Sequence, residues 1–149
     1  MSTKGDRPID LLLVEDNPGD VRLIQELLKG SKFKYKVRVA GDGEEALKNL
    51  YENGLPRLPL PDLILLDLKL PRVSGQKVLA RIKGDAMLSR IPVIVLTSSS
   101  SEEDIATAYG LHANCYITKP MSLEHYNDFL RSMEDFWLRV VTLPPTNKR

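Results

Sequence analysis

Residues 9–18 read IDLLLVEDNP, and this stretch sets the pattern of the whole chain. The apolar run over 9–14, bounded by acidic side chains, predicts a buried strand. Asn17 is suited to cap the start of a helix and Pro18 to fill its first position, because proline lacks the backbone N–H that would be unpaired there. With apolar residues along one face and Gly30 as the stop, a helix is predicted to follow the strand directly.

This unit of a short strand followed by a helix recurs along the rest of the sequence. Nearly continuous apolar strands that alternate with helices are typical of a parallel sheet covered on both faces, so an α/β domain is predicted. Residues 53–61, NGLPRLPLP, contain three prolines and are predicted to loop out before the third strand. A capping box of Ser100 and Glu103 marks the start of the fourth helix. The further strands are predicted over 35–39, 63–66, 92–96 and 115–118, and the helices that follow them over 46–51, 78–82, 100–109 and 122–140.

The last helix, predicted to be capped by Ser122 and to end at Val140, is apolar over more than one face. Its main stripe, with spacings of three or four residues, is expected to cover the sheet. Phe136 lies off that stripe, which favours a two-fold homodimer, with packing against the 53–61 loop as the alternative. The stripe contains Leu123, Tyr126, Leu130, Met133 and Trp137, and the residues off it are Phe129, Phe136 and Val140.

The composition limits the class of protein. The chain has 149 residues and a mass of 16.8 kDa, the size of one globular domain, and we predict a domain over 1–141 with a polar tail over 142–149. A net charge of +1 argues against a nucleic-acid binder, and a single cysteine, Cys115, excludes an intrachain disulfide. Neither a signal peptide nor a membrane-spanning run is recognisable, so a cytoplasmic protein without membrane association is expected.

Acidic residues follow two of the predicted strands at the points where they end. Ligands of a parallel sheet bind beyond these carboxyl ends, so the side chains are expected to gather at one edge. Glu15 and Asp16 follow the first strand, and Asp67 follows the third. Three neighbouring carboxylates repel one another, and Mg²⁺, which binds carboxylates together with waters and phosphate oxygens, would relieve that repulsion.

The same edge carries the groups that an aspartyl phosphate would need. A carboxylate can act as a nucleophile and take up a phosphoryl group, whose oxygens then require a cation and hydrogen-bond donors. Lys119 after the fifth strand supplies the cation, and Thr97 with the backbone N–H of Ser98 after the fourth strand supplies the donors. Each residue taken singly also fits a helix cap or a solvated loop, but together they predict one phosphoryl-transfer site.

These residues and the motifs around them resemble the receiver domain of two-component response regulators. The resemblance covers residues 8–139. It implies a doubly wound (βα)5 flavodoxin-like fold, with a five-stranded parallel sheet in the order 2-1-3-4-5 and a C-terminally extended last helix. The motifs that carry it are Glu15-Asp16, LLDLKLPRVSG around Asp67, VLTS at Thr97 and ITKP over 117–120.

The resemblance also implies which residues form the metal site. Asp67 would be the phosphoacceptor. The cofactor would be Mg²⁺, for which Mn²⁺ can substitute. Its ligands would be Glu15, Asp16, Asp67 and the backbone carbonyl of Lys69.

A second set of residues would respond to the phosphoryl group, as the resemblance implies. Lys119 would contact that group together with the N–H of Ser98, and Thr97 and Tyr116 would be the switch residues. The peptide bond between Lys119 and Pro120 is expected to be cis, which proline permits at low cost. Phosphorylation would then reshape the face formed by the fourth helix, the fifth strand and the fifth helix.

Within this family, the chain looks like the stand-alone regulators that serve cyanobacterial and bacterial phytochrome kinases. EDNPGDVRLIQELL over 15–28, the proline-rich loop and the long last helix carry this closer resemblance. It implies a histidine kinase of the phytochrome type as phosphoryl donor. The homodimer favoured by the apolar faces of the last helix is expected to form through the fourth-helix to fifth-helix face and the C-terminal extension. No output domain, nucleic-acid partner or membrane partner is expected.

Three other classes of protein fit less well. A phosphatase of the haloacid dehalogenase type would need a second acid two residues after the nucleophile, where this chain has Lys69, so a turnover enzyme is not expected. A flavodoxin-like electron carrier would need Ser, Thr and Gly after the first strand, where Glu15 and Asp16 would repel the flavin phosphate. A histidine phosphotransfer module is a helical bundle, into which neither His112 nor His125 fits.

Overall fold

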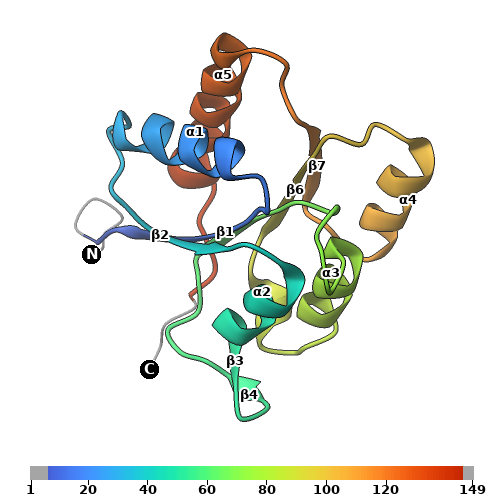
Figure 1. Ribbon diagram of the computed structural model, residues 1–149. Coiled ribbons are helices and arrows are strands. Elements are labelled where there is room, and N and C mark those ends of the chain that lie inside the picture. Colours follow the sequence, from blue (N-terminus) through green and yellow to red (C-terminus); the bar gives the residue numbers. More distant parts are fainter. Residues whose placement is uncertain (1–6, 146–149) are drawn as a thin grey trace.

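The computed structural model describes residues 7–145 and confirms the predicted fold (Figure 1). Its main sheet has five parallel strands in the order β2-β1-β5-β6-β7, which is 2-1-3-4-5 once the separate hairpin β3-β4 is left out. None of the helices among these residues is long and apolar enough to cross a membrane. The strands are β1 (Ile9–Val14), β2 (Tyr35–Ala40), β3 (Tyr51–Glu52), β4 (Leu55–Pro56), β5 (Leu63–Leu66), β6 (Val93–Thr97) and β7 (Cys115–Thr118). The helices are α1 (Pro18–Lys29), α2 (Gly43–Leu50), α3 (Gly75–Lys83), the 3₁₀ turn η1 (Leu88–Arg90), α4 (Glu102–Gly110), α5 (Leu123–Met133) and the π-helix η2 (Glu134–Val140).

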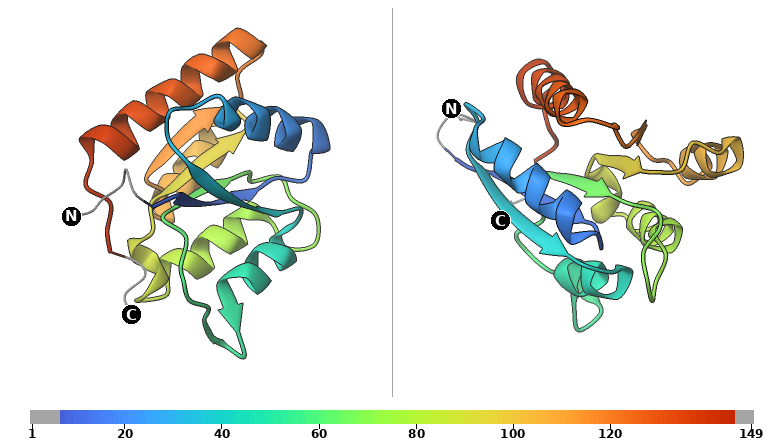
Figure 2. Two further views of the ribbon diagram at one scale, coloured as in Figure 1. Left: turned by 90° about the vertical axis from the view of Figure 1, so that its left-hand side faces the viewer. Right: turned by 45° about the horizontal axis from the view of Figure 1, so that its top comes forward.

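Two apolar layers hold the helices on the sheet. Successive side chains of a strand point to opposite faces, so β1 sends Leu11 and Leu13 into one layer and Leu12 and Val14 into the other. Helices α1 and α5 cover the first face, and α2 and α3 cover the second (Figure 2). Every residue of β1, β5 and β6 is buried, which explains why these strands are apolar without alternation.

The 53–61 loop opens with a hairpin that the sequence analysis missed. Helix α2 ends at Leu50, and Tyr51, which was predicted to belong to the helix, begins β3 and pairs antiparallel with β4. Asn53 and Gly54 form the turn with φ angles of 57° and 79°, left-handed values that asparagine and glycine tolerate best. The Asn-Gly pair indicates a hairpin turn, but the prolines that follow it favoured the prediction of an irregular loop.

Helix α4 begins one residue later than predicted. Ser101, rather than Ser100, caps the helix, because its side chain accepts a 3.0 Å hydrogen bond from the backbone N–H of Asp104. Three overlapping serine-acid pairs share the capping spacing, so the sequence alone did not distinguish them. The hydroxyl of Ser99 donates a 2.6 Å hydrogen bond to Asp104, which supports the observed register.

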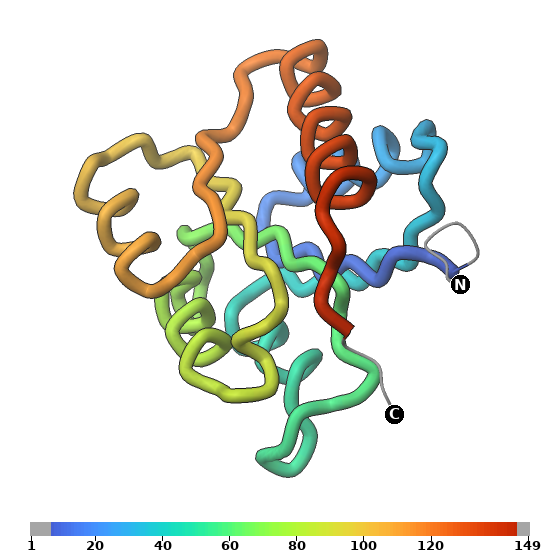
Figure 3. The backbone as a smooth tube through the Cα atoms, turned by 180° about the vertical axis from the view of Figure 1, so that it is seen from behind, coloured from blue at the N-terminus to red at the C-terminus, as the bar shows by residue number. Residues whose placement is uncertain are grey.

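The last helix runs on from α5 into η2 (Figure 3). Its winding changes from an α-helix to a π-helix at Glu134. A π-helix has a wider turn than an α-helix, so the buried face shifts and Leu138 enters the core. Tyr126, Leu130 and Met133 are buried as predicted. The prediction was wrong for Leu123, whose exposed fraction is 61% because it stands in the first turn, beyond the layer that packs on the sheet.

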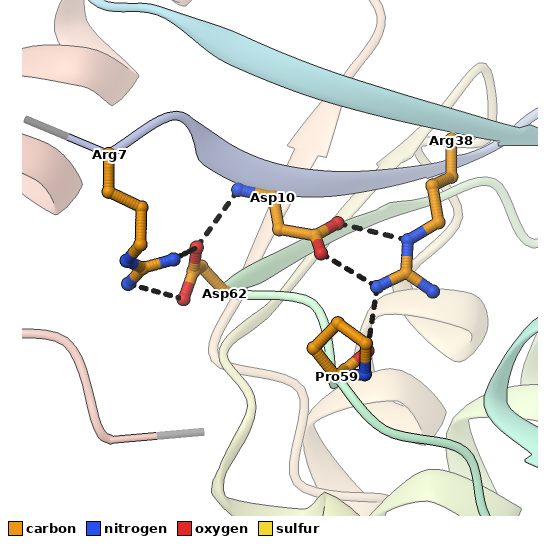
Figure 4. Close-up of polar contacts among 5 residues, drawn as sticks. All are labelled: Arg7, Asp10, Arg38, Pro59 and Asp62. Carbon is orange, nitrogen blue, oxygen red and sulfur yellow. Dashed lines mark hydrogen bonds and ion pairs between the residues drawn. The ribbon is translucent and has the colours of Figure 1, made fainter. Parts of the chain in front are cut away.

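A polar network at the amino end of β1 fastens the chain that leads into β5 (Figure 4). Arg38 donates two hydrogen bonds of 3.0 and 2.8 Å to the Asp10 carboxylate and a third, of 2.9 Å, to the carbonyl of Pro59. The carboxylate of Asp62 accepts from the backbone N–H of Asp10 and from Arg7. These acids lie at the start of the strands, away from the carboxyl ends, and their role is structural.

Candidate functional site

Three carboxylates meet at the carboxyl end of the sheet. Glu15 and Asp16 directly follow β1, and Asp67 directly follows β5, the strand that pairs with β1. One oxygen of each carboxylate lies within 4.8 Å of those of the other two, and Glu15 and Asp67 are buried whereas Asp16 is exposed. The structure thus brings together the three acids that the sequence analysis selected.

The ammonium group of Lys119 lies among these acids. Its Nζ is 2.9 Å from Glu15 Oε1, 3.1 Å from Asp67 Oδ2 and 2.7 Å from Asp20 Oδ2. Asp20 was not among the predicted site residues. An acid in the first turn of a helix ordinarily stabilises the helix terminus, and that ordinary role concealed its contact with Lys119.

Burial and charge shift the pKa values of this group. Burial raises the pKa of Glu15 to about 7, and the charge of Asp67 adds to the rise although the hydrogen bond from Lys119 opposes it. Burial alone would lower the pKa of Lys119, but its hydrogen bonds to Asp20 and Glu15 outweigh burial and raise it. The lysine is therefore a permanent cation in a cluster that still has an excess of negative charge.

The donor set fits a hard divalent cation. Carboxylate oxygens are the ligands that Mg²⁺ and Mn²⁺ prefer, and the exposed Asp16 leaves one side of the cluster open to waters. One ammonium does not balance three carboxylates, whereas an added double charge would. Glu15, Asp16 and Asp67 would hold the cation. The backbone N–H of Lys69 donates to Asp67 Oδ1 at 3.1 Å, and the role of the Lys69 carbonyl stays a prediction.

Thr97 is the last residue of β6, the strand next to β5, and its hydroxyl makes no hydrogen bond within the described residues. The residue is fully buried, and Oγ1 has no hydrogen-bond partner among residues 7–145. A buried hydroxyl without a partner costs about 1–3 kcal/mol, so its retention calls for an explanation. The backbone N–H of Lys119 donates to the Thr97 carbonyl at 2.8 Å, which ties the ends of β6 and β7 together. Ser98, the next residue, is exposed.

Tyr116 connects β7 with the turn before α4. The ring is half-buried, and its hydroxyl donates a 2.8 Å hydrogen bond to the carbonyl of Ser99. The expectation of a cis bond between Lys119 and Pro120 was wrong: this bond is trans, and the cis bond within residues 7–145 is Leu58–Pro59. Proline lowers the preference for trans to about 0.5–1 kcal/mol without selecting an isomer, so its presence alone could not decide.

Tyr126 has a buried hydroxyl in a side chain that was predicted only to cover the sheet. It is buried on α5, and its hydroxyl has no partner within the described chain. Burial, followed by the charge of Asp20, raises the pKa of Tyr126 to about 12. The hydroxyl therefore lies close enough to the carboxylate cluster to respond to its charge.

Two glycines allow the loop after β5 to pack tightly. A Cβ atom on Gly75, the first residue of α3, would overlap the carbonyl oxygen of Asp67 and the Cα of Leu68. A Cβ on Gly43 would overlap the carbonyl of Val73 in the same loop. The loop that carries Asp67 therefore packs directly against the backbone of Gly75 at its start and of Gly43 near its end, with no side chain between.

Comparison with known proteins places this site in a family context. The profile of the response regulator receiver domain matches residues 11–131. Response regulator Rcp1 of Synechocystis sp. is 45% identical over 145 residues, which cover 97% of this chain and 99% of Rcp1. The structure of the phosphorylated cyanobacterial phytochrome response regulator RcpA is similar at a TM-score of 0.87 and 46% identity, covering 93% of this chain and 100% of RcpA. The Mn²⁺-bound form of Rcp1 gives a TM-score of 0.83 at 44% identity, with 93% of this chain and 100% of that structure covered.

Proposed function

Because this chain belongs to the response regulator receiver domain family, we propose that Asp67 accepts a phosphoryl group from a histidine kinase. One observation carries the proposal: the buried Asp67 carboxylate contacts the Lys119 ammonium and shares the acidic cluster with Glu15 and Asp16. The protein acts as a regulator that is modified and relays a signal. Lys69 stands where a phosphatase would need its second acid, so we propose that it is not a turnover enzyme.

The transfer forms one bond and breaks another. An oxygen of Asp67 attacks the phosphorus atom of the kinase's phosphohistidine, the P–N bond breaks and a P–O bond to Asp67 forms. Lys119, the Thr97 hydroxyl and the backbone N–H of Ser98 then meet the phosphoryl oxygens. The three carboxylates and the Lys69 carbonyl would hold a divalent cation, which would supply further positive charge for these oxygens.

The phosphoryl group provides the partner that the Thr97 hydroxyl lacks. Movement of Thr97 toward it would displace the following turn, where the carbonyl of Ser99 holds the Tyr116 hydroxyl. The output is then a change in the face formed by α4, β7 and α5.

The relation to the phytochrome response regulator RcpA supports a phytochrome-type histidine kinase as the donor. We propose a homodimer through the α4-β7-α5 face and η2, a cytoplasmic location, and no nucleic-acid or membrane partner. The receiver domain would span 1–141, with 142–149 as its tail, of which 146–149 lie outside the described residues.

Phosphorylation with a small acyl phosphate tests the proposal directly. With Mg²⁺ present, intact mass spectrometry should detect one base-labile phosphoryl group on the wild-type protein and none on Asp67→Asn. Asp42→Asn is the matched control, because Asp42 follows β2 at the same edge of the sheet but is not in the carboxylate cluster. Equal labelling of Asp67→Asn and wild type would refute the assignment. Transfer from a panel of purified kinases, phytochromes included, then identifies the donor class.

A further inference from the structure

Asp20 makes the shortest contact with Lys119, yet it is not one of the three clustered carboxylates. Its Oδ2 lies 2.7 Å from Nζ, compared with 2.9 Å for Glu15 and 3.1 Å for Asp67. The first turn of α1 fixes its position. The backbone N–H of Asp20 donates to the Asn17 side chain at 3.0 Å, and the N–H of Asn17 donates to Glu15 at 3.1 Å. The same turn therefore places Glu15 and Asp20 around one ammonium group.

These contacts surround Lys119 with anionic partners. An ammonium group has three N–H donors and no acceptor; two hydrogen bonds go to Asp20 and Asp67, and Glu15 lies 2.9 Å away as an ion pair. A phosphoryl oxygen on Asp67 must therefore compete with these carboxylates for Lys119.

A divalent cation would release two of the three contacts but not the third. Glu15 and Asp67 belong to the cluster that would hold the cation, and their charge would then be met by the metal. Asp20 lies outside that cluster and would still depend on Lys119. The exposed fractions are 14% for the Lys119 side chain and 24% for that of Asp20, so water screens this pair only in part.

We infer that Asp20 is a positioning residue that holds Lys119 in the unphosphorylated protein and competes with the phosphoryl group for it. The inference rests on the proposed phosphorylation of Asp67. Asp20 touches no reacting atom and acts through the lysine alone. Its carboxylate lowers the affinity of the site for phosphoryl oxygens, and Lys119 exchanges one anionic partner for another when Asp67 is modified.

Binding of beryllium fluoride, a phosphoryl analogue that attaches to aspartate carboxylates, measures this competition. It should be titrated by ¹⁹F NMR with saturating Mg²⁺ against wild type, Asp20→Asn, Lys119→Ala and the double variant. Asp20→Asn should bind about fivefold more tightly than wild type, the scale of one partly screened charge-assisted hydrogen bond. Asp20→Glu keeps the carboxylate and should restore weaker binding. In the Lys119→Ala background, the same asparagine substitution should change the affinity much less.

The matched control is Glu26→Gln, which removes a different carboxylate from α1, one whose ion pair among residues 7–145 is with the exposed Lys29. It should bind like wild type. An unchanged affinity in Asp20→Asn overturns the inference, and so does an equal gain with and without Lys119, since that would show simple repulsion by Asp20. If wild type failed to bind the analogue, or Asp67→Asn bound it equally well, the proposed function would fail as well. If wild type binds beryllium fluoride normally and Asp20→Asn binds it no more tightly, the inference about Asp20 is overturned but the proposed function is not.

Discussion

The hydroxyl of Tyr116 is hydrogen-bonded at 2.8 Å to the backbone carbonyl of Ser99. This bond joins the last strand of the sheet to the turn that precedes α4. The buried Thr97 hydroxyl, which lacks a partner within residues 7–145, lies two residues before that carbonyl. Thr97 and the carbonyl that accepts from Tyr116 therefore belong to one short segment, and we expect a change at Thr97 to reach the ring through the backbone.

Thr97→Val should make the folded protein more stable and at the same time abolish the response of Tyr116 to phosphorylation. Valine keeps the shape and removes the unpartnered hydroxyl, so the free energy of unfolding without metal should rise by about 1 kcal/mol. Phosphorylation should then no longer alter the NMR signals of the Tyr116 ring. Urea denaturation and NMR of the phosphorylated protein measure the two effects. Thr118→Val, at the exposed end of β7, is the control and should leave the Tyr116 response intact.

The stability of the metal-free protein should fall as the pH rises. The pKa of Glu15 is raised from 4.5 to about 7, so the folded state binds this proton more tightly than the unfolded state does. The resulting stabilisation is complete below the unfolded pKa and is lost as the pH rises through about 7. Relative to Glu15→Gln, wild type should lose roughly 1–3 kcal/mol across this window in urea denaturation with a chelator present.

Magnesium should reverse that trend, because the cation requires ionised carboxylates. The stabilisation that Mg²⁺ gives to wild type should be larger above the pKa of Glu15 than below it, and Asp16→Ala should remove most of it. If the free energies of unfolding of wild type and Glu15→Gln changed in parallel with pH, the raised pKa of Glu15 would be contradicted.

Arg38→Met should destabilise the fold without touching the site. The substitution removes the ion pair between Arg38 and Asp10. The Asp10 carboxylate would stay buried without it, because the side chain of Asp10 is only 8% exposed. Loss of one partner of a buried ion pair costs about 3 kcal/mol or more. Urea denaturation should show this loss, and the double variant Asp10→Leu with Arg38→Met should recover much of it. A loss as small as that of an exposed pair would show that the network is not a structural anchor.

Phe136→Asp should convert a homodimer into a folded monomer that still accepts a phosphoryl group. Phe136 and Val140 are 53% and 62% exposed on η2, and in a two-fold interface each substitution acts twice. Light scattering at tens of micromolar measures the mass with and without phosphodonor. Leu55→Asp is the control, since Leu55 is 69% exposed on the β3-β4 hairpin, far along the chain from η2. A wild-type protein that is monomeric in both states would rule out the dimer.

The sequence predicted the acidic cluster because its members follow adjacent strands. Once β1 and β5 pair in parallel, Glu15 and Asp67 have to lie side by side, whatever the loops do. Asp20 escaped prediction for the opposite reason. Its contact with Lys119 depends on how α1 is tilted over the sheet, and no local pattern of residues records that tilt.

The winding of the last helix escaped prediction for a different physical reason. An apolar stripe constrains which residues are buried only if the number of residues per turn is known. Within α5 the stripe was correct for Tyr126, Leu130 and Met133 and wrong for Leu123 in the first turn. It missed Leu138, where the π-helix has shifted the buried face. The hydroxyls of Thr97 and Tyr126, which lack hydrogen-bond partners among the described residues, could not be predicted either, because hydrogen bonding of a buried group depends on the packed structure.

The packing of the loop after β5 on Gly75 ties the backbone of Asp67 to the start of α3. The backbone N–H of Gly75 bonds to the carbonyl of Leu68 at 2.9 Å, and no side chain stands between the helix and the carbonyl of Asp67. A contact between two backbones cannot relax by side-chain rotation, so any side chain introduced at position 75 would have to displace the backbone of Asp67. The placement of the clustered acid therefore depends on the residue type at the first position of α3.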